Sequence, residues 1–190
     1  KKKYNLPDRY IFTLASRMPH KNFSSLLQAW RLIQSKLEIK DIGLVIAGGL
    51  SYPLQCDITY VRSARFPNIY DLGYVPEEDL SLLYGGADLF VYPSRYEGFG
   101  LPPLEAMACG TPVVVSNVAS LPEVIGDAGI CVDPYNVDDI AQGIYRVLTN
   151  ENLQQKLREK GLNRAKLFTW EKTARETLKV YDEVARKRKD

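Results

Sequence analysis

The sequence is poor in the side chains that bind transition metals, with one histidine and three cysteines among its 190 residues. Cys56, Cys109 and Cys131 have neither metal-ligand nor redox spacing, which is typical of reduced thiols in a cytosolic protein. The single histidine, His20, excludes most histidine-rich metal sites and disfavours a histidine-based catalytic triad. We interpret His20 as an exposed histidine without a catalytic role.

Long apolar runs and a strong charge of one sign are also missing. No run approaches the roughly eighteen apolar residues that a membrane-spanning helix needs, and the amino-terminal lysines have no apolar stretch behind them to form a signal peptide. A net charge of +2 is too balanced to indicate nucleic-acid binding by itself. The basic segment "ARKRKD" is typical of a solvated helix end, with a membrane or partner contact as the alternative.

Two common nucleotide-binding signatures do not occur. The motif G-x-x-x-x-G-K-[ST] of a Walker P-loop is absent from the sequence. A G-x-G-x-x-G motif fails because Pro103 stands where its third glycine would be, which weakens an interpretation as a dinucleotide-cofactor site. Any nucleotide site in this chain therefore has another construction.

The sequence does contain a regular alternation of apolar strand segments and helical segments. Segments such as "GLVIAG" and "TPVVVS" are continuously apolar, as strands buried on both faces are. With helices between them, they predict an α/β fold: a three-layer, Rossmann-like, doubly wound parallel sheet of about six strands, followed by C-terminal helices. The expected strands are 9–16, 42–49, 68–75, 88–94, 111–117 and 128–134; the expected helices are 22–37, 54–65, 76–87, 101–109, 120–126, 136–149, 151–166 and 169–187.

Such sheets bind ligands at the carboxyl ends of their strands, and the loop after the first strand carries two cations. Arg17 and Lys21 precede a helix that starts near Asn22, a good N-cap residue. Cations at a helix N-terminus are unfavourable unless an anion completes the site. The pair suits a diphosphate, and two ordinary surface cations remain the alternative.

The next two loops carry weaker signals. Gly48, after the second strand, allows a backbone to approach a ligand, although a tight strand exit explains it equally. Tyr74 and Val75 follow the third strand and are placed to bracket a flat base, with closure of the hydrophobic core as the alternative.

The segment 92–112, "YPSRYEGFGLPPLEAMACGTP", combines two acids with a glycine-containing turn and a helix start. Gly98 and Gly100 leave backbone N–H groups uncovered before the helix, an arrangement that binds anions. Glu105 is expected in the first helical turn, where an acid also favours the helix dipole. Glu97 precedes the helix and has no such structural explanation. Acids flanking amide donors suit the diols and phosphates of a sugar nucleotide.

The chain resembles the C-terminal, donor-binding domain of GT-B fold retaining glycosyltransferases, family 4, also called glycosyltransferases group 1. The resemblance runs from "TLASRMPHKN" through the E-x(7)-E signature, Glu97 to Glu105, to "FTWEKTARETLKVY". It implies that Arg17 and Lys21 bind the donor diphosphate and stabilise the leaving nucleotide. It further implies that Glu105 holds the ribose hydroxyls, while Glu97 contacts the transferred sugar.

By the same resemblance, the backbone amides of Phe99, Gly100 and Leu101 face sugar or phosphate, and Tyr74 and Val75 form the base-binding loop. The implied donor is a UDP- or GDP-sugar. Transfer retains the anomeric configuration, the leaving phosphate helps to deprotonate the acceptor, and no metal or other cofactor is required. The loop "PHKN" is reminiscent of mannosyltransferases acting on bacterial surface polysaccharide.

Family members have two Rossmann-like domains, whereas residues 1–190 have room for one. The chain is therefore interpreted as a single nucleotide-sugar-binding domain whose N-terminal acceptor domain is absent, and whose last helix exposes apolar residues including Trp170, Leu178 and Tyr181. The expected activity, with that domain, is transfer of a mannosyl or glucosyl group to a glycan or lipid-linked acceptor in polysaccharide biosynthesis.

Three alternatives to this activity stay open. They are a non-catalytic nucleotide-sugar-binding module, a glycogen- or starch-synthase-like glucosyltransferase domain and a sugar-nucleotide epimerase; the last lacks an E-x(7)-E signature. The expected location is the cytoplasm, or the inner face of the membrane if the other domain makes a peripheral contact there. No nucleic-acid partner is expected.

Overall fold

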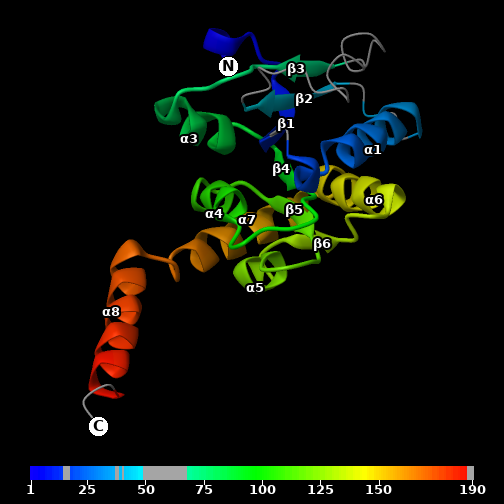
Figure 1. Ribbon diagram of the computed structural model, residues 1–190. Helices are drawn as coiled ribbons and strands as arrows, with labels where there is room; N and C mark the ends of the chain where they lie inside the picture. Colours follow the sequence, from blue (N-terminus) through cyan, green and yellow to red (C-terminus); the bar gives the residue numbers. More distant parts are fainter. Residues whose placement is uncertain (15–17, 37–38, 40, 49–67, 188–190) are drawn as a thin grey trace.

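The computed structural model describes residues 1–14, 18–36, 39, 41–48 and 68–187 (Figure 1). These residues form a parallel sheet with the strand order β3-β2-β1-β4-β5-β6. The order reverses between β1 and β4, so this sheet has its topological switch point there. The predicted doubly wound sheet is confirmed. Its strands are β1 (Arg9–Leu14), β2 (Ile42–Ala47), β3 (Ile69–Asp71), β4 (Leu89–Tyr92), β5 (Val113–Ser116) and β6 (Ile130–Val132).

Two helical layers cover the sheet and make separate hydrophobic cores. On one face, α1 and α6 pack together over side chains that include Trp30 and Ile144. On the other face, α3, α4 and α5 enclose a core that includes Tyr84 and Phe90. The helices are α1 (Phe23–Lys36), α3 (Glu77–Gly85), α4 (Leu101–Ala108), α5 (Leu121–Ile125), α6 (Val137–Leu148), α7 (Glu151–Ala165) and α8 (Trp170–Lys187), with short 3-10 turns η1 (Lys2–Tyr4) and η2 (Pro19–Lys21).

The central strands are buried on both faces, as their continuous apolar runs predicted. Every residue of β2, β4 and β5 is buried. The two edge strands are the exceptions. The strand β3 covers three residues where 68–75 was expected, and none of them is fully buried. The strand β6 covers three residues where 128–134 was expected, and of these Val132 is buried. An edge strand pairs on one side alone, which explains its shorter ladder. The helix expected over 54–65 lies outside the described residues.

The last helix, α8, is exposed along its whole length. No residue of α8 is buried, and Figure 1 shows the helix projecting away from the sheet and its covering layers. The expected exposure of Trp170, Leu178 and Tyr181 is confirmed, since these side chains are exposed to 78%, 59% and 67%. Within the described part of the chain, no helix is both long and apolar enough to cross a membrane.

Candidate functional site

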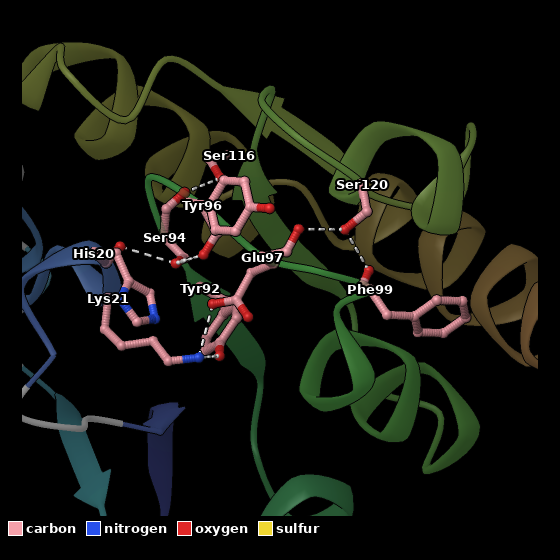
Figure 2. Close-up of polar contacts among 9 residues, drawn as sticks. All are labelled: His20, Lys21, Tyr92, Ser94, Tyr96, Glu97, Phe99, Ser116 and Ser120. Atoms are coloured by element: carbon pink, nitrogen blue, oxygen red, sulfur yellow. Dashed lines mark hydrogen bonds and ion pairs between the residues drawn. The ribbon is translucent and has the colours of Figure 1, made fainter.

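Lys21 and Glu97 meet at the carboxyl edge of the sheet, from the loops after β1 and β4. Lys21 Nζ lies 2.7 Å from Glu97 Oε1, and it also donates a hydrogen bond to the Tyr92 hydroxyl. Figure 2 shows all three side chains converging on one point. The site is at the switch point between β1 and β4, where sheets of this type bind their ligands.

The Lys21–Glu97 pair is largely withdrawn from water, with side-chain exposures of 19% and 11%. Burial by itself raises the pKa of Glu97. The hydrogen bond from Lys21 and the charge of Lys21 outweigh burial, with help from neighbouring hydroxyl groups, and hold the pKa of Glu97 below its ordinary value. Glu97 is therefore an ionised, oriented acceptor at neutral pH, suited to accept hydrogen bonds from hydroxyl groups.

The other predicted cation, Arg17, lies outside the described residues. Asn22 does not cap α1 in the predicted way, because its side-chain nitrogen donates to the backbone carbonyls of Pro93 at 3.0 Å and Pro134 at 2.7 Å. Its Oδ1, the atom that would accept a capping hydrogen bond, has no partner in the described part of the chain. Asn22 instead ties the end of the Lys21 loop to the loops after β4 and β6.

Serine hydroxyls fasten the Glu97 loop to its neighbours, as the dashed lines in Figure 2 show. Ser94 donates to the His20 carbonyl at 2.9 Å, and buried Ser116 donates to the Ser94 carbonyl. Ser120 lies 3.0 Å from the Glu97 carbonyl and 2.8 Å from the Phe99 carbonyl. The sequence interpretation missed these serines, although two of them end or directly follow continuously apolar strands.

Gly100 is required by the backbone that leads into α4, whereas Gly98 is not. Gly100 has φ +105°, and a Cβ there would lie 2.6 Å from Leu121 Cδ2. A Cβ at Gly98 would meet nothing within 4 Å. Since Pro102 and Pro103 lack N–H groups, the free donors at the start of α4 come from Gly98–Leu101, which fits the predicted amide role.

Glu105 lies in the second turn of α4, not in the first turn as predicted. The helix begins at Leu101, and its first turn contains no acid. An acid in the second turn is too far from the helix start to cap it or to gain much from the dipole. The prediction that Glu105 caps the helix or stabilises its dipole from the first turn is therefore wrong. Its side chain is exposed, and Tyr84 donates a hydrogen bond to Oε2 at 3.0 Å.

The predicted base-binding loop divides into one exposed and one buried side chain. Tyr74 is 78% exposed, whereas Val75 is 6% exposed and belongs to the core beneath α3 and α4. Val75 thus closes the core and offers a ligand its backbone alone. Gly48 has φ +133°, and its N–H donates to the Gly73 carbonyl at 2.7 Å. Gly48 therefore forms a tight turn at the end of β2, which is the alternative interpretation that the sequence left open for this glycine.

Phe99 connects the amide-bearing loop to the segment between α7 and α8. Its ring contacts the ring of Phe168 edge-on, with the ring centres 5.8 Å apart, and the Arg164 guanidinium lies 5.1 Å from the Phe168 ring centre.

Among the described residues, no group of three histidine, cysteine, aspartate or glutamate side chains is arranged to hold a metal ion.

Comparison with known sequences places these features in a family. Residues 1–164 match the family described as glycosyl transferases group 1, and the chain belongs to that family. It is 43% identical over 175 residues to the O-antigen chain mannosyltransferase B of Escherichia coli, covering 90% of this chain and 45% of that protein. It is 40% identical over 112 residues to the MMP alpha-(1->4)-mannosyltransferase of Mycolicibacterium hassiacum, covering 57% of this chain and 27% of that one. The chain thus spans less than half the length of these relatives.

Solved structures agree with the fold. A sucrose-phosphate synthase from Thermosynechococcus elongatus superposes with a TM-score of 0.80 at 30% identity, covering 96% of this chain and 47% of that one. The C-terminal domain of a glycosyl transferase group 1 family protein from Francisella tularensis has a TM-score of 0.72 at 23% identity, covering 87% of this chain and 89% of that one. This likeness confirms the predicted fold of a C-terminal GT-B domain.

Proposed function

We propose that this chain binds the nucleotide-sugar donor of a hexosyltransferase at the carboxyl edge of its sheet. The observation that carries the proposal is the withdrawn Lys21–Glu97 pair beside the amides that lead into α4. A cation and amide donors suit the diphosphate, while the oriented carboxylate suits sugar hydroxyls. We assign Glu105 to the ribose hydroxyls, and Arg17 to the diphosphate together with Lys21.

The donor is proposed to be a UDP- or GDP-sugar, and the transferred group a mannosyl or glucosyl group. The names of the relatives, two of which are mannosyltransferases, favour mannosyl. We propose transfer with retention of configuration to a glycan or lipid-linked acceptor in polysaccharide biosynthesis, in the cytoplasm or at the inner face of the membrane. Cationic side chains and a helix N-terminus are proposed to neutralise the leaving diphosphate without a metal ion.

Titration calorimetry with UDP, GDP and their glucose and mannose conjugates tests the binding proposal. We expect the unaltered chain to bind one base in preference to the other. Glu105→Ala should weaken that binding by about tenfold, because a charge-assisted hydrogen bond to a diol is lost. Absence of binding for all of these ligands, or binding that Glu105→Ala leaves untouched, would contradict the proposal.

We also propose that an acceptor domain precedes this one and covers the apolar face of α8. The exposed side chains on α8 include Trp170, Leu178 and Tyr181, and the relatives are more than twice as long as the matched region. Hydrogen exchange should be fast in α8 of the 190-residue chain and slower in a chain that carries the preceding domain. Exchange in buried β4 should be the same in both chains. Equal exchange of α8 in both would show that the preceding domain leaves it exposed.

A further inference from the structure

Tyr84, at the end of α3, is buried beneath the exposed carboxylate of Glu105. Its side chain is part of the core, and the residue is 2% exposed. The ring is held edge-on by Phe12 at 5.3 Å and by Phe90 at 5.2 Å. Its backbone is fixed as well, since Thr111 Oγ1 donates to the Tyr84 carbonyl at 2.6 Å. The Tyr84 hydroxyl therefore has little freedom to point elsewhere.

The Glu105 carboxylate depends on that hydroxyl for its orientation. In the described part of the chain, Tyr84 is the hydrogen-bond partner of Glu105, through Oε2 at 3.0 Å, and no cation pairs with the carboxylate. A glutamate on an exposed helical face otherwise samples several rotamers, and fixing one of them at binding costs free energy. One oxygen is held by Tyr84, so the second remains available for a ligand.

The hydroxyl is a permanent donor toward this carboxylate. Burial, and then the negative charge of Glu105, raise the pKa of Tyr84 far above its ordinary value. Tyr84 therefore stays protonated at neutral pH and keeps its O–H available to donate to Glu105.

We propose that Tyr84 is a positioning residue that holds the Glu105 carboxylate toward the ribose diol of the bound nucleotide. This inference rests on the proposed function, because it needs a ribonucleotide at this edge of the sheet. The competing explanation is that Glu105 merely satisfies the hydroxyl of a buried tyrosine. The two explanations differ in whether the loss of the hydroxyl weakens ribose recognition.

Tyr84→Phe removes the hydroxyl and keeps the ring. Affinities for UDP and GDP, and for their 2′,3′-dideoxy analogues, should be measured by calorimetry on the whole chain. We expect Tyr84→Phe to bind the preferred ribonucleotide about tenfold more weakly and the dideoxy analogue as the unaltered chain does. In a Glu105→Ala background, Tyr84→Phe should have no further effect on affinity, since the two residues act through one contact.

Tyr10→Phe is the matched control. Tyr10 belongs to the same core and is equally buried, but its hydroxyl donates to the Leu83 carbonyl at 2.8 Å rather than to an acid. This variant should leave all four affinities unchanged. Unaltered ribonucleotide binding by Tyr84→Phe, or equal losses for the ribo- and dideoxy ligands, would overturn the inference alone. Failure of the unaltered chain to bind either ribonucleotide would overturn the proposed function and this inference with it.

Discussion

Replacing Lys21 with alanine is expected to lower both stability and nucleotide affinity by large amounts. The substitution leaves the largely buried Glu97 carboxylate without its cation, 2.7 Å away in the intact protein. Breaking a buried ion pair costs about 3–5 kcal/mol, and we expect a loss of about 3 kcal/mol here because neither side chain is completely buried. Affinity for the diphosphate should fall about 10- to 100-fold with the loss of one charge-assisted contact.

The stability loss should depend on pH. The pKa of Glu97 in the folded protein lies below its ordinary value, so the stabilisation is present above that ordinary value and is lost as pH falls through the folded pKa. Lys21→Ala removes two of the causes that lower this pKa. The difference in unfolding free energy between the two proteins should therefore widen as pH rises from about 4 to 7. Denaturant unfolding at several pH values measures it.

Two further variants separate the structural role of Lys21 from its role in binding. The double variant Lys21→Ala/Glu97→Gln has no buried unpaired charge and should recover much of the lost stability, but not the affinity. Lys160→Ala removes a lysine from an ion pair with Asp127, whose carboxylate is exposed, and should change stability little. A pH-independent stability loss in Lys21→Ala, or unchanged diphosphate affinity, would contradict the assigned role.

Replacing Gly100 with alanine is expected to destabilise the chain by about 3 kcal/mol and to disturb the start of α4. Two costs combine at this position. A residue with a Cβ is strained at φ +105°, and that Cβ would lie 2.6 Å from Cδ2 of the fully buried Leu121. Because relief of the clash moves the amides before α4, nucleotide affinity should fall as well. Thermal or denaturant unfolding and calorimetry measure the two effects.

The glycines of this chain provide controls that isolate each cost. Gly73 has φ +63°, and a Cβ there would meet nothing within 4 Å, so Gly73→Ala should show the backbone strain alone, about 1 kcal/mol. Gly98→Ala should cause neither backbone strain nor a steric contact, and it should leave stability nearly unchanged. Equal stability losses at Gly100 and Gly73 would show that the contact with Leu121 has no cost.

Much of the fold was predictable because its signals are local. Continuously apolar segments can be satisfied only by strands covered on both faces, so "GLVIAG" and "TPVVVS" indicated the central sheet directly. Glu97 could also be singled out, because an acid beside glycines before a helix has no ordinary structural use. The position of Glu105 was predicted less well, since one or two residues of uncertainty at a helix start decide which turn it occupies.

The tyrosine hydroxyls at the site could not be predicted. In the sequence, Tyr92 cannot be distinguished from the other apolar residues of a buried strand, and Tyr84 cannot be distinguished from the other core residues of a helix. Whether such a hydroxyl meets a carboxylate depends on how α3 and α4 pack and on where β4 ends. Neither the packing of α3 on α4 nor the end of β4 can be predicted from the periodicity of apolar residues. The division of Tyr74 and Val75 into exposed and buried neighbours was undecided for the same reason.

By itself, the sequence determined the α/β class, the parallel sheet and the family of this chain, because the signals for buried strands and loop motifs each lie within a short stretch of consecutive residues. The tertiary structure alone decided which charges meet. Lys21 and Glu97 are 76 residues apart, and Tyr84 and Glu105 are 21 apart on separate helices. Contacts at such separations follow from the order of strands in the sheet and from helix packing, which no local pattern of residues encodes.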